Sequence, residues 1–180
     1  MSLDFFTNLW KKKDLSAWLV VIRLLVGIEW FMAGLGKVLE TAPTFPEGMA
    51  GTLGFFASAN PNTWYVNLIN NSFLPNAELF GYLVMLGELI VGITLILGLF
   101  TNFSAIASIF MNLNFFFAAA HLSPSTSSIN WMMAGLGFVL LLGYGSKTVG
   151  LDSLIGSINY PLYRIFVDWF GFDKSMKAVK

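Results

Sequence analysis

Three charged residues stand inside stretches of the sequence that are otherwise apolar. Arg23 and Glu29 fall within residues 18–37, and Glu88 falls near the middle of residues 78–100. Each stretch is long enough to cross a bilayer as a helix, and a charge at that depth must be paired or used. Because carboxylates in apolar surroundings can relay protons, we treat Arg23, Glu29 and Glu88 as candidate catalytic residues of a buried proton network. The alternative is that these charges only hold the helices together.

The spacing of residues along the first stretch predicts which side of its helix faces the protein. A 4-3-4-3 spacing places five residues on one face, and its two glycines leave room for a neighbouring helix. Counting about 1.5 Å of rise per residue from each end puts Arg23 at a depth compatible with Glu88. We therefore predict that Arg23 pairs with Glu88 or Glu29. The face consists of Arg23, Gly27, Trp30, Gly34 and Lys37.

The composition predicts that these stretches belong to a small polytopic membrane protein. Hydrophobic residues make up 56% of the 180 residues and charged residues only 11%, whereas soluble proteins carry about a quarter charged residues. We expect an all-α fold, a four-transmembrane-helix bundle with interfacial amphipathic helices, formed by one membrane domain over residues 1–180. The expected transmembrane helices cover about residues 17–37, 78–100, 103–120 and 130–146.

The residue types also exclude several classes of function. The chain has no cysteine and one histidine, so we expect neither a bound metal ion nor a haem. Ten basic and ten acidic residues give a net charge of zero, and no basic cluster of the size that nucleic-acid binding requires is present. Any redox chemistry must therefore use groups other than cysteine thiols, metal ions or haem.

The segments outside the four stretches are expected to lie at the membrane surfaces. Residues 38–76 form an external segment with two amphipathic runs, which is either an interfacial spacer or a lid over a site. Residues 152–180 resemble an amphipathic tail on the cytoplasmic surface. Basic residues outside the stretches number eight on the side of the termini and one on the other, so both termini are predicted to be cytoplasmic, with the protein in the cell membrane. The eight are Lys11, Lys12, Lys13, Lys147, Arg164, Lys174, Lys177 and Lys180.

Four motifs resemble those of a known membrane family. They are RLLVGIEWFMAGLGK in the first stretch, GELIVGITLILGLFTN closing the second, NLNFFFAAAHLSPS leaving the third, and GLD at residues 150–152. Together they are similar to the DoxX/DoxD family, and in particular to its DoxD branch. The resemblance implies a membrane subunit of a thiosulfate:quinone oxidoreductase, which oxidises thiosulfate to tetrathionate, passes electrons to a membrane quinone and works with a DoxA-like second subunit. The alternative is a non-catalytic membrane anchor or assembly subunit of a redox complex. In either case the candidate neighbours are membrane lipid and further copies of the chain.

This implied activity suggests two binding sites. Thiosulfate is a hydrated dianion, so its site needs water and positive charge. We expect that site at the external end, with Lys37 and His121 bracketing a pocket that the segment around Trp64 covers. Trp30, on the polar face of the first helix, is the candidate for contact with the quinone. The alternative is that Lys37 only anchors a helix end at the membrane surface.

Overall fold

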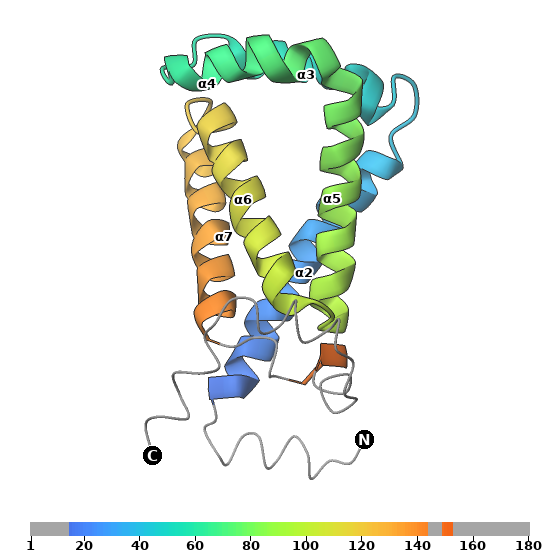
Figure 1. Cartoon of the computed structure of the whole chain (residues 1–180), viewed down its shortest axis with the longest axis vertical. Helices are drawn as coiled ribbons and strands as arrows, with labels where there is room; N and C mark the ends of the chain where they lie inside the picture. The colour runs from blue at the N-terminus through green and yellow to red at the C-terminus, as the bar shows by residue number, and fades with distance from the viewer. Residues whose placement is uncertain (1–14, 144–148, 153–180) are drawn as a thin grey trace.

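The computed structural model describes residues 15–143 and 149–152, and this part of the chain is built from helices. Four of these helices are long and apolar enough to cross a membrane (Figure 1). The predicted all-α bundle of four membrane-spanning helices is thereby confirmed. They are α2 (Leu15–Val38), α5 (Ala77–Leu97), α6 (Thr101–Ala119) and α7 (Pro124–Leu142).

The four long helices pack as two pairs, α2 with α5 and α6 with α7. In Figure 1 the pairs meet near the lower end of the described bundle and diverge toward the upper end. Glycines allow α2 and α5 to approach closely, because a Cβ at Gly34 would lie 2.6 Å from the Leu89 backbone nitrogen. The glycines of the predicted inward face thus do leave room for a neighbouring helix.

Shorter helices lie across the upper end of the bundle (Figure 1). They are α3 (Phe45–Ala57), α4 (Thr63–Leu68), a π-helical turn η1 (Ile69–Phe73) and a 3₁₀ turn η2 (Leu74–Asn76). We call residues 45–76 the cap. The amide nitrogen of Asn60 ties the cap to the end of α6 by donating hydrogen bonds to the carbonyls of Phe117 and Ala118, both at 3.0 Å.

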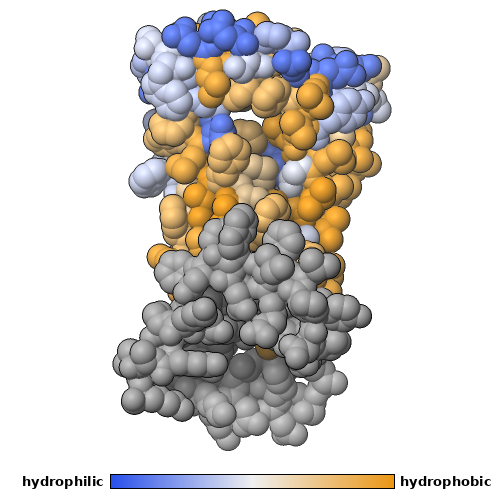
Figure 2. All heavy atoms as spheres, viewed as in Figure 1, coloured by the Kyte–Doolittle hydropathy of each residue, from blue (hydrophilic) through white to orange (hydrophobic). Residues whose placement is uncertain are grey.

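Large apolar side chains cover the outer faces of the spanning helices. Leu25 on α2 and Trp131 on α7 are each about three-fifths exposed, at 61% and 64%. Figure 2 shows the hydrophobic residues as an orange band below a more hydrophilic cap. Such a band fits contact with lipid, because a soluble protein rarely exposes an apolar area of this extent.

The helix ends differ from the predicted bounds for local reasons. The second span ends at Leu97 rather than at residue 100, because Gly98 adopts a left-handed conformation with φ of 64°. The fourth helix begins at Pro124, six residues before its predicted start, because the Ser123 hydroxyl caps it by accepting from the Thr126 backbone nitrogen at 3.0 Å. The predicted amphipathic tail lies outside the described residues apart from Asp152.

Candidate functional site

A cavity of about 720 Å³ lies beneath the cap, between the two helix pairs. Every described helical element except the short η2 turn contributes to its lining. Figure 2 shows this face hollowed within its orange band. The predicted amphipathic run of α3 turns toward the cavity in full, so this part of residues 38–76 covers the cavity. The α3 side chains concerned are Phe45, Met49, Leu53 and Phe56.

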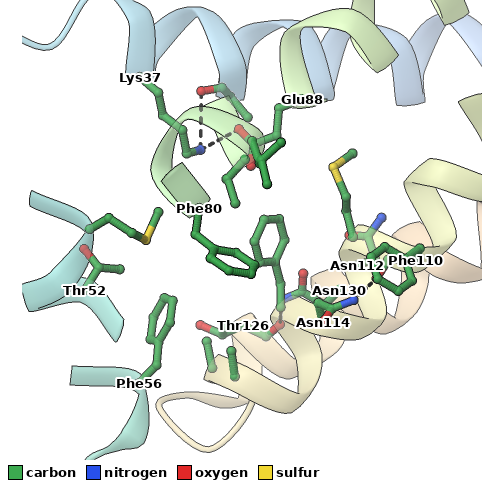
Figure 3. A pocket seen from close by; sticks show the side chains of 18 of the residues that line it. Lys37, Thr52, Phe56, Phe80, Glu88, Phe110, Asn112, Asn114, Thr126 and Asn130 are labelled. Carbon is green, nitrogen blue, oxygen red and sulfur yellow. Dashed lines mark hydrogen bonds and ion pairs between the residues drawn. The ribbon is translucent and has the colours of Figure 1, made fainter. Parts of the chain in front are cut away.

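One wall of the cavity carries an ion pair between α2 and α5. Lys37 Nζ lies 2.6 Å from Glu88 Oε2 and also donates to the Ala33 carbonyl at 3.4 Å (Figure 3). Glu88 is only 2% exposed, so the ammonium group of Lys37 takes the place of water as the partner of its carboxylate. The ammonium group also sits 5.2 Å from the centre of the Phe45 ring, which links the pair to the cap.

The opposite wall carries uncharged polar side chains from α6 and α7. Figure 3 shows Asn112, Asn114, Asn130 and Thr126 grouped there, across the cavity from Lys37. Each of the three asparagines donates from its amide nitrogen to a backbone carbonyl four residues earlier in its own helix. The Asn114 oxygen also accepts a hydrogen bond from the Tyr65 hydroxyl at 3.1 Å, which joins α6 to the cap.

Trp30 also lines the cavity, as its predicted contact with a quinone requires. Its indole nitrogen donates to the Ser108 hydroxyl at 2.8 Å, and its ring centre lies 6.1 Å from that of Phe115. Glu29 lines the cavity as well, but its residue is exposed. Glu29 therefore stands at the rim of the cavity, as do Leu83 and Phe110, which line the cavity and are also exposed.

The predicted pairing of Arg23 is wrong. Its guanidinium donates to the Val149 carbonyl and lies so close to Gly98 and Gly150 that neither position has space for a Cβ. Gly98 is ten residues beyond Glu88, or about 15 Å along α5. Glu88 pairs with Lys37 instead, and Glu29 forms no ion pair within the described part of the chain. Estimating depth from Cα positions failed because the long Lys37 side chain reaches back along its helix to Glu88.

Arg23 instead belongs to a second polar cluster, at the end of the bundle away from the cap. The carboxylate of Asp152 accepts from the backbone nitrogens of Phe100 and Thr101, both at 2.8 Å, and its own backbone nitrogen donates to the Gly98 carbonyl at 2.8 Å. This carboxylate thus caps the start of α6. No role was predicted for Asp152, although the GLD motif at residues 150–152 contains it.

The three residues expected to bind thiosulfate do not converge on the cavity. Lys37 lines it, but its charge is compensated by Glu88. His121 lies outside the lining and shares a hydrogen bond of 3.2 Å with the Ser58 carbonyl. Trp64 also lies outside the lining, and its ring packs edge-on against Phe117. Within the described residues no group of three histidine, aspartate or glutamate side chains could hold a metal ion.

Comparison with known protein families agrees with this architecture. A family model described as DoxX matches residues 18–122, which run from α2 through the end of α6. The chain belongs to the DoxX family. It is therefore a multi-pass membrane protein, and the matched part includes both residues of the Lys37–Glu88 pair. No curated protein and no solved structure shows significant similarity to the chain.

Proposed function

We propose that this DoxX protein is the membrane subunit of a thiosulfate:quinone oxidoreductase and that it reduces a membrane quinone in the cavity. The observation that carries the proposal is the cavity itself. Its aromatic lining suits a flat ring, and its two polar walls suit oxygen atoms on opposite edges of that ring. The choice of thiosulfate as electron donor rests on the resemblance to the DoxD branch.

The proposed reaction sets requirements that the cavity can meet. Two thiosulfate ions join through a new S–S bond and release two electrons, and the quinone takes up these electrons with two protons to form the quinol. The Lys37 ammonium can donate a hydrogen bond to a ring oxygen that gains negative charge. Glu88 in the wall and Glu29 at the rim can pass protons inward. Arg23 is no longer part of the proposed proton network, because it lies at the end of the bundle away from the cap and the cavity.

The thiosulfate site is assigned to a second, DoxA-like subunit. A hydrated dianion requires uncompensated positive charge. Among the described residues that line the cavity, the only positive charge is that of Lys37, which is already paired with a carboxylate. The aromatic residues around it would further disfavour an ion that holds its water strongly. In this proposal the present chain supplies the quinone site and the partner supplies the sulfur chemistry.

The test is thiosulfate-dependent reduction of a soluble quinone analogue by membranes that contain the chain and its partner. Deletion of the chain should abolish the activity. Glu88→Gln should lower the rate at least ten-fold, whereas Glu78→Gln, which changes an exposed carboxylate on the same helix, should leave it unchanged. If a folded Glu88→Gln protein supports the full rate and cavity-blocking Ala33→Trp does so as well, the chain is a non-catalytic anchor.

A further inference from the structure

Two amides in the cavity have oxygen atoms to which no described residue donates a hydrogen bond. Asn112 is 3% exposed and Asn130 is 9% exposed, and both line the cavity. Their nitrogens face backbone carbonyls, at 2.9 Å from Ser108 and 2.8 Å from Thr126 respectively. A carbonyl oxygen can only accept, so these contacts fix the nitrogen of each amide toward its helix and turn the oxygen away from it.

Within the described part of the chain no group donates to either oxygen. Side-chain oxygens in a protein interior usually accept a hydrogen bond from protein or from another molecule. The two oxygens are not fully enclosed, so they keep accessible surface and another molecule in the cavity can donate to them. The third asparagine of the same wall follows this rule, because the Asn114 oxygen accepts from the Tyr65 hydroxyl. Asn112 on α6 and Asn130 on α7 differ from Asn114 in this respect, because their oxygens are free to accept a hydrogen bond from a ligand in the cavity.

We infer that Asn112 and Asn130 bind the oxygen substituent on one edge of the quinone ring, and that they hold both its oxidised and its reduced form. This inference rests on the proposed function. A quinol hydroxyl can donate to an amide oxygen, and a quinone carbonyl can accept the second N–H of Asn130, which no described residue uses. The site therefore never has to release the ring between the two redox states.

The surrounding residues agree with this placement. Lys37 and Glu88 lie on the opposite wall and can meet the oxygen on the other edge of the ring (Figure 3). An anion is disfavoured beside two amide oxygens, which are themselves the negative ends of dipoles. Exposed apolar residues at the rim, Leu83, Phe110 and Ile129, leave a route by which an isoprenoid tail can reach the lipid.

The inference is tested by ligand binding to the purified full-length chain in lipid nanodiscs, independently of thiosulfate. Quenching of tryptophan fluorescence, to which Trp30 in the cavity contributes, reports titrations with a short-chain ubiquinone analogue and with its quinol. We expect Asn130→Leu to weaken the binding of both forms by about five- to ten-fold, as the loss of a hydrogen bond predicts. Asn112→Leu should weaken the binding of the quinol alone by a similar factor, because the Asn112 nitrogen already donates to Ser108 and leaves only the amide oxygen for the ligand. The matched control is Thr52→Val, because the Thr52 hydroxyl lines the same cavity but already donates to the Gly48 carbonyl.

The outcomes separate this inference from the proposed function. If the unmodified chain binds the quinol and both leucine variants bind the quinol as tightly as Thr52→Val does, the amide assignment is overturned while binding in the cavity stands. If the unmodified chain binds neither form, both proposals fail. Should Asn112→Leu not fold, as judged by its elution and melting temperature, Asn112→Ser and Asn130→Leu carry the same comparison.

Discussion

Lys37 and Glu88 stand 51 residues apart in the sequence, yet Nζ of one lies 2.6 Å from Oε2 of the other. The pair joins the two helices that pack most closely and at the same time forms part of the cavity wall. It therefore has both a structural and a chemical consequence. The structural consequence can be measured without knowing the substrate.

Removal of either partner of this ion pair should destabilise the protein. Lys37→Met or Glu88→Gln alone leaves the other polar group enclosed without its partner, at a cost of roughly 3 to 5 kcal/mol. The double variant should lose less than the sum of the single variants, because neither charge is then left behind. Melting temperatures of the four proteins in one detergent form the measurement. Additive losses would contradict the pairing.

The close approach of α2 and α5 predicts different effects for two glycines on one helix. Gly34→Ala forces a methyl group against the Leu89 backbone and should cost about 1 to 3 kcal/mol. Gly36→Ala places its methyl group in open space and should be neutral or stabilising by up to about 1 kcal/mol. Equal melting temperatures for the two variants would show that the helices are not in contact at Gly34.

The carboxylate of Asp152 should control the order of the turn between α5 and α6. Asp152→Asn replaces one accepting oxygen with a nitrogen, so one of the two backbone N–H groups, that of Phe100 or that of buried Thr101, loses its partner, at a cost of about 1 to 3 kcal/mol. Hydrogen exchange at Phe100 and Thr101 should accelerate. Glu78→Gln, which also removes one negative charge, serves as the control and should leave exchange at the turn unchanged.

The start of α3 should depend on pH through Glu47. Hydrogen bonds from the backbone nitrogen and hydroxyl of Thr44 lower the pKa of the Glu47 carboxyl below its ordinary value. A lowered pKa in the folded state means that the stabilisation is present above the ordinary glutamate pKa and is lost as pH falls through the lowered value. Amide exchange in the first turn of α3 should accelerate over that range. Glu47→Gln should abolish this pH dependence, and an unchanged profile would contradict the assignment.

The distribution of basic residues predicts that the cap faces outward and both termini face the cytoplasm. Because the chain has no cysteine, single cysteines report this cleanly. Asn70→Cys, at an exposed position of the cap, should react with an impermeant reagent in intact cells. Lys177→Cys should react only after the cells are opened. Labelling of Lys177→Cys from outside would contradict this orientation.

Hydrophobic length and periodicity were sufficient to predict the four spans, because a bilayer demands about twenty apolar residues for each crossing helix. The inward face that contains Gly27 and Gly34 was also predictable from spacing. The early start of α7 was not predictable in this way, because its first turns contain polar residues such as Ser125 and Ser128 and therefore lack the apolar pattern of a span. The start of this helix is defined instead by the Ser123 cap.

The site was only partly predictable for a related reason. Glu88 and Trp30, both singled out from the sequence, do line the cavity. The partner of Glu88 depends on the reach and direction of the Lys37 side chain, which spacing does not give. The amides of Asn112 and Asn130 could not be distinguished from ordinary interhelical asparagines. What distinguishes them is that no described residue donates a hydrogen bond to their oxygens, and this depends on the packed structure.

The hydrogen bonds of Asp152 also constrain how the protein is made. The turn at Gly98–Thr101 leaves the ribosome about fifty residues before the carboxylate that caps it. The second and third helices must therefore enter the membrane with the start of α6 still uncapped. The turn can form these two hydrogen bonds only after the fourth helix has been synthesised, so a chain that stops after α7 would lack both of them.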